Sequence, residues 1–245
     1  MKVEILTIFP GFFAGPLDET ILKRAVEKGR LAVSLRDIRD YATDKHSKTD
    51  DVPFGGGPGM VMKPEPVVAA IEASRAAGFA RVALLDPGGA RFDARAAARL
   101  AREPSLALVC GRYEGFDDRI RAFADEEISV GDFVLSGGEP AALVVLDAVA
   151  RLLEGVLGNE ASAQTESFAD GLLEAPAFTR PREFRGVAVP EVLTRGDHEA
   201  IRRWRRRESL ARTIARRPEL VEAARRDGRL SAEDAKLLDE LSKTK

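Results

Sequence analysis

Apolar and polar positions along this chain follow two alternating patterns. Short, nearly continuous apolar runs, typical of parallel strands that are buried on both faces, are separated by segments with helical periodicity. The apolar runs are VEILTIF, LAVSLRDI, RVALLD, LALVCG and DFVLSG, and the helical segments are DETILKRAVEKG, EPVVAAIEASRAAG and ARAAARLARE. This alternation predicts βαβ units, and therefore an α/β fold, over about residues 1–155.

The stretch from Val130 to Gly155 has the pattern of an apolar strand, a glycine pair and a long apolar helix. Glycines between a strand and a helix let a ligand approach the backbone, and the helix N-terminus offers amide donors to an anion. Here Gly138 is followed by Glu139, and the lysine of a phosphate-binding loop is missing. Since a phosphate would meet a carboxylate, the turn argues against a nucleoside triphosphate.

The α/β pattern ends at a polar segment of small residues. GNEASAQTESFADG, which runs from Gly158 to Gly171, has almost no apolar content and is typical of a linker that orders on binding. The chain after it begins irregularly, with prolines, and then becomes helical. We predict an α/β domain at 1–157, a flexible linker at 158–174 and a small helical domain at 175–245.

The composition is that of a globular protein without a membrane segment. Of 245 residues, 44% are hydrophobic and 32% are charged, and no apolar run is long enough to cross a bilayer. The apolar core of MKVEILTIFPGFF is too short for a secretory signal, so we expect a cytoplasmic protein. One cysteine and two distant histidines exclude a disulfide framework and give no metal-ligand spacing.

Charge is distributed unevenly, although the net charge is only −2. From Ala175 to Arg217 the chain has twelve arginines, no lysine and five acids. Guanidinium groups bind phosphates in a bidentate fork, so this segment suits a nucleic-acid backbone. The alternative is a solvated helical face held by ion pairs.

Glycine-bearing loops follow several of the predicted strands, where ligands of open α/β sheets bind. They are LLDPGG, CGRYEGFDDR and SVGDFVLSGGE, together with the earlier DDVPFGGGPGM. These loops lack a dinucleotide fingerprint and a phosphate-loop lysine but offer backbone groups and apolar walls. An adenine ring fits that description, and Glu114 and Asp132 could face a cationic tail or ribose hydroxyls.

Several motifs taken together show a resemblance to a known family. DDVPFGGGPGM, CGRYEGFDDR, SVGDFVLSGGE, GVLGNEAS, ESFADGLLEAP, GDHEAIRRWR and RRPEL occur in order between Ile5 and about Leu220. This chain resembles the bacterial tRNA (guanine-N1)-methyltransferases, the TrmD family.

The resemblance implies a fold, a reaction and a set of partners. The fold would be of the SPOUT type, a parallel sheet with a deep C-terminal trefoil knot, followed by a small helical domain. The enzyme would methylate N1 of the guanosine immediately 3′ of the anticodon, position 37 of tRNA, which maintains the reading frame. It would use S-adenosylmethionine and work as a homodimer with active sites at the subunit interface. The family's link between proton transfer and magnesium makes Mg²⁺ a candidate cofactor.

The resemblance also assigns residues to the methyl donor, by motif. They are Leu84, Leu85, Asp86, Pro87, Gly111, Tyr113, Glu114, Gly115, Val130, Gly131, Asp132, Phe133, Val134, Leu135, Gly137 and Gly138.

Arg151 and Glu166 are the expected catalytic residues. Arg151 matches the family's arginine assigned to the guanine, and pairing with Asp147 on the same helix is its structural alternative. Glu166 stands where the family has an aspartate as the general base, so a carboxylate is kept with a longer reach. Asp170 is the fallback base.

Further residues are expected to bind tRNA. Asp50 and Gly59 would help to form the guanine pocket and the dimer interface, whereas Arg202, Arg205 and Arg206 would contact phosphates.

Two features depart from the family pattern. Glu166 replaces an aspartate, and Pro140 comes one position early in GGEPAAL. The alternatives are therefore another SPOUT-type RNA methyltransferase, or an RNA-binding module that has lost catalysis.

Overall fold

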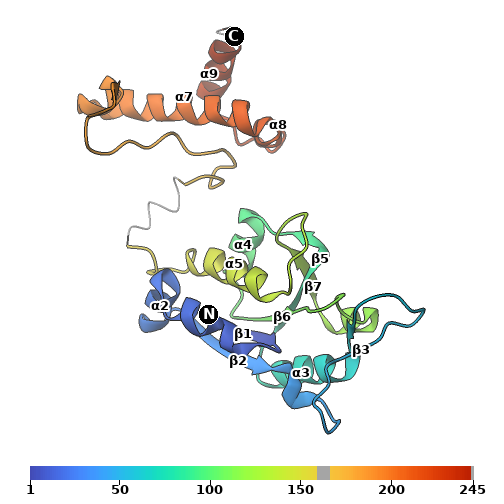
Figure 1. Cartoon of the computed structure of the whole chain (residues 1–245). Coiled ribbons are helices and arrows are strands. Elements are labelled where there is room, and N and C mark those ends of the chain that lie inside the picture. The colour runs from blue at the N-terminus through green and yellow to red at the C-terminus, as the bar shows by residue number, and fades with distance from the viewer. Residues whose placement is uncertain (159–165, 244–245) are drawn as a thin grey trace. The chain divides into compact units, whose positions relative to one another are not determined.

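The chain forms two compact units, Met1–Gly158 and Asn159–Lys245, each with its own hydrophobic core (Figure 1). The computed structural model describes residues 1–158 and 166–243. The middle of the predicted linker, residues 159–165, lies outside the described residues.

The first unit is built on a sheet of five strands in the order β2-β1-β6-β5-β7. All of its strand pairs are parallel. The strands are β1 (Lys2–Thr7), β2 (Ala32–Asp37), β5 (Arg81–Arg91), β6 (Ser105–Cys110) and β7 (Glu126–Ser129). The central strand β6 is buried at every position, as expected for an apolar run between two layers of helices. The predicted α/β fold is therefore confirmed.

The last strand lies earlier in the chain than the apolar pattern predicted. Strand β7 is Glu126–Ser129, a segment with two acids that the pattern did not single out. It forms the edge of the sheet, where the carboxylate of Glu126 reaches the guanidinium groups of Arg99 at 3.0 Å and Arg81 at 3.3 Å. Because arginines neutralise them, charged side chains are compatible with this edge strand.

The predicted strand DFVLSG is wrong, since residues 132–137 form a loop. Its apolar side chains do not enter the core: Phe133 is 54% exposed and Val134 is 86% exposed. The apolar run predicted side chains packed in the core of the sheet. Instead, these side chains line a cavity at the end of the sheet.

Strand β5 leaves the sheet briefly at its carboxyl end. Leu85 and Ala90 both pair with Ile128 of β7, so residues 86–89 form an irregular excursion between them. This excursion is the first of three loops that meet at the same edge.

Helices cover both faces of the sheet, and Figure 1 shows α3 on the opposite side from α5. On one face, α2 (Thr20–Glu27), α4 (Ala94–Leu100) and α5 (Glu139–Ala150) pack on a cluster that includes Ile5 of β1. On the other face, α3 (Pro64–Ala76) packs on a cluster that includes the next residue, Leu6. Successive strand residues point to opposite faces, which explains why β1 is apolar throughout.

Shorter elements complete this unit. They are η1 (Pro10–Phe13), α1 (Ala14–Leu17), η2 (Ile38–Tyr41), η3 (Asp118–Phe123) and the antiparallel pair β3 (Asp50–Asp51) and β4 (Val61–Met62).

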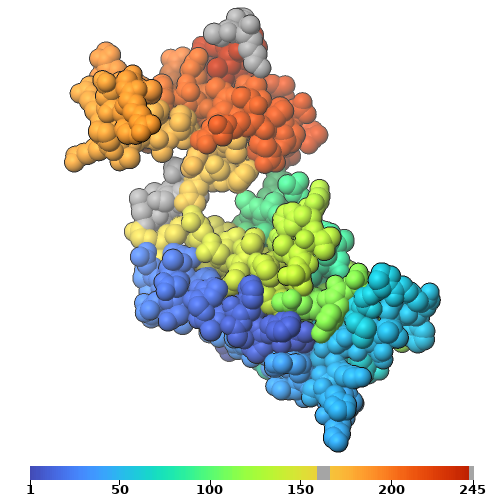
Figure 2. Space-filling view, viewed as in Figure 1, coloured from blue at the N-terminus to red at the C-terminus, as the bar shows by residue number. Residues whose placement is uncertain are grey.

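The second unit is helical, and the prediction of C-terminal helices is confirmed. Its elements are the hairpin β8 (Glu183–Phe184) and β9 (Val187–Ala188), then η4 (Glu191–Thr194), α7 (His198–Arg216), α8 (Pro218–Arg226) and α9 (Ala232–Lys243). The side chains of these helices, orange to red in Figure 2, pack closely together. Their buried core consists of Leu172, Leu210, Val221, Ala224, Leu237 and Leu238.

Asp197 caps α7, because its carboxylate accepts a hydrogen bond from the Ala200 amide at 3.0 Å. In the part of the chain that the structure describes, no helix has both the length and the apolar character required to span a membrane.

Candidate active site

A cavity of about 400 Å³ lies at the carboxyl edge of the sheet. Three loops form it: the excursion of β5, the loop after β6 and the loop between β7 and α5. Its lining residues are Leu85, Asp86, Pro87, Gly111, Arg112, Tyr113, Glu114, Gly115, Arg121, Ile128, Ser129, Val130, Gly131, Phe133, Val134, Leu135, Gly137, Gly138 and Ala141. The structure thus brings together most of the residues that the sequence assigned to the methyl donor.

Two of the assigned residues do not line this cavity. Leu84 is fully buried in the core cluster on the α3 face of the sheet. Asp132 belongs to the loop after β7 but is absent from the lining.

Gly138 is required by the close approach of two backbones. A Cβ atom at Gly138 would lie 2.7 Å from the Cα of Cys110 and 2.9 Å from the amide nitrogen of Gly111. The Gly138 amide donates to the Gly111 carbonyl at 2.8 Å. The glycine therefore lets the chain that enters α5 pack directly on the end of β6.

Glu139 does not line the cavity, contrary to the expectation from sequence that a ligand at the glycine turn would meet its carboxylate. Its side chain is fully buried, Thr7 donates to it at 2.6 Å, and an Arg112 guanidinium nitrogen lies 2.9 Å away. The same guanidinium stacks over the ring of Phe9, 4.4 Å from its centroid. A buried carboxylate needs such partners, so Glu139 ties β1, the loop after β6 and α5 together behind the cavity.

The cavity combines apolar walls with a few charged groups. Leu85, Ile128 and Val130 are among its apolar lining residues, and Asp86 and Glu114 bring carboxylates to it. Such a surface suits an uncharged ring together with a cationic group.

Arg121 faces Asp86 from the η3 side of the cavity. One of its guanidinium nitrogens lies 3.4 Å from the Asp86 carboxylate, and the same side chain pairs with Glu127 of β7. The Asp86 carboxylate also accepts from the Gly88 amide at 2.8 Å, which shapes the excursion of β5.

The segment of Asp50 and Gly59 lies against the loop after β6. The Met60 carbonyl accepts from the Glu114 amide at 2.8 Å, and a Cβ atom at Gly59 would collide with the Glu114 side chain. Burial, with the charge and hydrogen bond of Asp50, raises the pKa of Tyr113. Asp50 and Gly59 are therefore close to two residues of the cavity.

Arg151 lies at the far end of α5 from the cavity. It caps the helix, where its amide donates to the Asp147 carbonyl at 3.1 Å. The helix has 12 residues. At 1.5 Å per residue it separates Arg151 from the glycine pair by about 18 Å.

Glu166 belongs to the second unit, where it lines a hollow of about 1190 Å³ beside α7. Arg202, Arg205 and Arg206 also line this hollow, as does Asp170.

These three arginines have different environments. Arg202 pairs with Glu199 at 2.6 Å and with Glu233 at 3.4 Å. Arg206 pairs with Asp234 and Asp170. Arg205 is exposed and forms no ion pair or side-chain hydrogen bond with residues 1–158 or 166–243.

Sequence reasoning missed several cavity residues, chiefly Arg112, Arg121 and Ser129. Arg112 lies inside the motif CGRYEGFDDR, so the motif contained the signal, whereas Ser129 ends the strand that the apolar pattern misplaced. Within the described ranges no group of three or more His, Cys, Asp or Glu side chains could hold a metal ion.

Comparisons with known proteins agree with this arrangement. A family model described as tRNA (Guanine-1)-methyltransferase TrmD matches residues 1–223. A protein of Geotalea uraniireducens (strain Rf4) named tRNA (guanine-N(1)-)-methyltransferase is 56% identical over 245 residues, 99% of this chain and 98% of the relative. A relative of the same name from Anaeromyxobacter sp. (strain Fw109-5) is 57% identical over 242 residues, which cover 98% of this chain and 96% of that protein. The chain therefore belongs to the tRNA (guanine-1)-methyltransferase TrmD family.

Proposed function

We propose that this chain transfers a methyl group from S-adenosylmethionine to N1 of the guanosine immediately 3′ of the anticodon, position 37 of tRNA. The family match over residues 1–223 carries this proposal, and the cavity formed by the three predicted donor loops supports it. The methylated base would maintain the reading frame. Because tRNA is a cytoplasmic molecule, we propose the cytoplasm as the site of the reaction.

The cavity fits the methyl donor in size and chemistry. Its volume is about 400 Å³, and its apolar walls suit an adenine ring. The carboxylates of Asp86 and Glu114 suit a cationic sulfonium and its amino group. We assign donor binding to the predicted residues that line the cavity: Leu85, Asp86, Pro87, Gly111, Tyr113, Glu114, Gly115, Val130, Gly131, Phe133, Val134, Leu135, Gly137 and Gly138.

Methylation of guanine N1 requires a base and a stabilised oxyanion. We assign the base to the Glu166 carboxylate, which takes the N1 proton, and the stabilising group to the Arg151 guanidinium, which faces the charge that develops on O6. The donor, when bound, supplies an electrophilic methyl group, and its sulfur keeps the electron pair of the broken bond. The three loops would orient the methyl group of the donor toward guanine N1.

We infer a homodimer with active sites at the subunit interface. Arg151 lies about 18 Å along α5 from the glycine pair of its own chain, so a second copy could bring its arginine to the cavity. Exposed apolar side chains near the start of the chain and on α5 support an interface: Phe9, Phe12 and Val144 are 46%, 42% and 51% exposed.

Subunit mixing tests this dimer. Arg151→Ala removes the arginine, and Leu135→Asp puts a charge into the cavity wall, so each homodimer should be inactive. A mixed dimer would retain one complete site, and the mixture should recover about a quarter of the activity. No recovery in mixtures shown to exchange subunits would contradict a shared site.

We also propose that the loops around the cavity form the trefoil knot of the SPOUT fold. The segment after β7 packs on the loop after β6, through the bridge between Arg112 and Gly137, although β5 separates these strands in the sheet. A chain that crosses a neighbouring strand in this way is compatible with threading.

The remaining assignments concern tRNA and magnesium. We propose that Asp50 and Gly59 contribute to the guanine pocket, and that the helical unit binds tRNA with Arg202 and Arg205. The proposed role of magnesium rests on the resemblance alone, and chelation tests it. If a divalent ion assists proton transfer, EDTA should lower the methylation rate and added Mg²⁺ should restore it.

One experiment tests the proposed function. Purified protein is incubated with methyl-labelled S-adenosylmethionine and a tRNA transcript that has guanosines at the last anticodon position and the next one. The label should enter this transcript, and replacing the second guanosine should abolish transfer. Label in both transcripts would indicate a different target base. Donor and tRNA binding without transfer would indicate an RNA-binding module instead.

A further inference from the structure

The segment that carries Glu166 is a compact turn. The Phe168 amide donates to the Leu172 carbonyl at 2.7 Å, and the Ala169 amide donates to the Glu166 carbonyl at 3.2 Å. The Asp170 carboxylate accepts from the Leu172 amide at 3.1 Å. These bonds hold residues 166–172, which include Glu166 and Asp170, in one turn.

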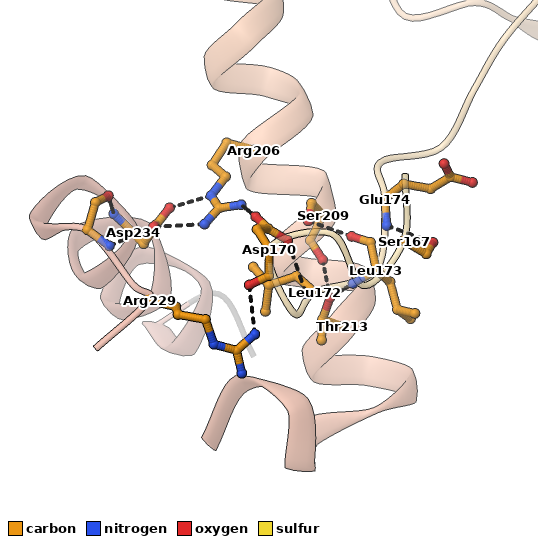
Figure 3. Close-up of polar contacts among 11 residues, drawn as sticks. Ser167, Asp170, Leu172, Leu173, Glu174, Arg206, Ser209, Thr213, Arg229 and Asp234 are labelled. Atoms are coloured by element: carbon orange, nitrogen blue, oxygen red, sulfur yellow. Dashed lines mark hydrogen bonds and ion pairs between the residues drawn. The ribbon is translucent and has the colours of Figure 1, made fainter. Parts of the chain in front are cut away.

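The turn is docked on α7, as Figure 3 shows. Leu172 is buried in the core of the helical unit. The Leu173 amide donates to the Thr213 hydroxyl at 3.0 Å, and the Ser209 hydroxyl donates to the Leu173 carbonyl at 2.5 Å. Both main-chain groups of Leu173 are therefore held by side chains of one helix.

Arg206 connects this turn to α9. Its guanidinium makes a bidentate pair with Asp234, at 2.6 and 2.9 Å, and its remaining terminal nitrogen pairs with the Asp170 carboxylate (Figure 3). Asp234 is only 2% exposed and also accepts from the Ser231 amide at 2.8 Å. Arg206 is thus fixed on one side by a buried carboxylate and holds the turn on the other.

A second arginine, Arg229, also binds the turn, through the main chain of Asp170. Arg229 donates to the Asp170 carbonyl at 3.0 Å. Gly171, with φ of 90°, makes room for it, because a Cβ atom at this position would collide with the Arg229 guanidinium.

We propose that Arg206 is a positioning residue for the methyl transfer: held by Asp234, it fixes Asp170 and with it the turn that presents Glu166. This inference rests on the proposed function, because it takes Glu166 as the base. It replaces the expectation that Arg206 contacts a tRNA phosphate and that Asp170 is a second base. Both groups are engaged in an ion pair with each other, whereas Arg205, the adjacent residue, is exposed.

The test compares Arg206→Gln and Asp170→Asn with Arg205→Gln as the matched control. The side-chain oxygen of Asn can still accept a hydrogen bond from the Leu172 amide, so Asp170→Asn removes the ion pair and keeps the turn. We call the ion pair of Arg206 with Asp170 the clamp, and Arg206→Gln and Asp170→Asn the clamp variants. Single-turnover methylation at saturating tRNA should fall about tenfold in both clamp variants, because a small displacement of a catalytic group is costly. The dissociation constant for tRNA should change less than twofold. Arg205→Gln should keep a near-normal single-turnover rate and should weaken tRNA binding instead.

A double variant and hydrogen exchange complete the design. If Arg206 acts through Asp170, the double variant should lose no more rate than either single variant. Exchange of the Leu173 amide, which lies at the docking point, should be about tenfold faster in both clamp variants and unchanged in Arg205→Gln.

The outcomes separate this inference from the proposed function. An inactive wild-type protein would overturn the function, while hydrogen exchange would still report on the clamp. An active wild-type protein with unchanged rate and exchange in Asp170→Asn would overturn the positioning role. A loss of tRNA affinity in Arg206→Gln at normal rate would return Arg206 to the phosphate contacts.

Discussion

The two candidate parts of the active site are held by different kinds of contact. Around the donor cavity, main chain meets main chain at Gly138, and the buried carboxylate of Glu139 behind it is enclosed by Thr7 and Arg112. Around Glu166, the turn is held mainly by side chains of α7 and by the ion pairs of Arg206.

This difference predicts different sensitivities. Main-chain packing tolerates no added atoms and responds little to salt or pH, because it involves no exposed charge. Ion pairs between side chains depend on protonation and tolerate exchange of the partners more readily. The donor cavity should therefore be a fixed template, whereas the base-bearing turn should be adjustable.

The largest effect is expected from removing the proposed base. Glu166→Ala should lower the single-turnover rate by about a thousandfold, since general-base catalysis contributes roughly 10²- to 10⁴-fold. Binding of S-adenosylmethionine, measured by calorimetry, should be unchanged because the cavity lies in the other unit. Glu166→Asp should keep most activity, and near-normal turnover in the alanine variant would assign the proton transfer to another group.

The second effect tests the fixed template. Gly138→Ala should weaken donor binding about a hundredfold and destabilise the α/β unit by about 3 kcal/mol, because backbone atoms must move. Gly15→Ala is the control, since a Cβ atom there has nothing within 4 Å. Thermal unfolding and calorimetry measure both effects. A Gly138→Ala variant that behaved like the control would show that the backbone around the cavity can move to accommodate an added methyl group.

The third effect concerns pH. Burial would raise the pKa of Asp234, but hydrogen bonds from Arg206 and Ser231 outweigh it and hold the pKa at about 2, below the ordinary 3.8. A depressed carboxyl pKa stabilises the native state above pH 4, and that contribution is lost as the pH falls toward 2.

Wild-type protein should therefore lose on the order of 2 kcal/mol more than Asp234→Asn between pH 5 and pH 2. Urea unfolding at several pH values measures this difference. Asp239→Asn, also on α9, is the control and should follow the wild-type curve. Parallel curves for wild type and Asp234→Asn would mean that the pair contributes nothing.

The smallest effect distinguishes the adjacent arginines. Arg205→Gln should weaken tRNA binding about fivefold and reduce the slope of log affinity against log salt by about 0.7 to 1, the value for one phosphate contact. Lys236→Gln, an exposed charge of α9, is the control for general electrostatic attraction. Equal losses in both variants would indicate a diffuse field.

The sequence predicted the fold class well, because burial on both faces leaves an apolar signature in the central strands. The motifs that resemble the family also picked out most of the residues that line the cavity. The apolar pattern misplaced β7, where Glu126 and Glu127 interrupt that signature and are neutralised by arginines from other strands and helices. Such long-range pairing leaves no local pattern. The same applies to Glu139, whose partners Thr7 and Arg112 are distant in the chain.

The helical unit shows a sharper limit. Arg205 and Arg206 are neighbours of identical type in one arginine-rich run, and no periodicity tells which of them has a carboxylate opposite it. That depends on Asp170 and Asp234, which come from a turn and a helix on either side of α7 in sequence. Only the tertiary structure separates an arginine that is engaged from one that is available.

The two units are contiguous in the chain, and this has a consequence for biosynthesis. Every residue that lines the donor cavity lies between Leu85 and Ala141, before Glu166 and the arginines of α7. Domains generally fold as units during translation, N-terminal first. A nascent polypeptide can therefore complete the cavity, and gain stability from the methyl donor that we propose binds there, before the segments proposed to engage tRNA have been synthesised.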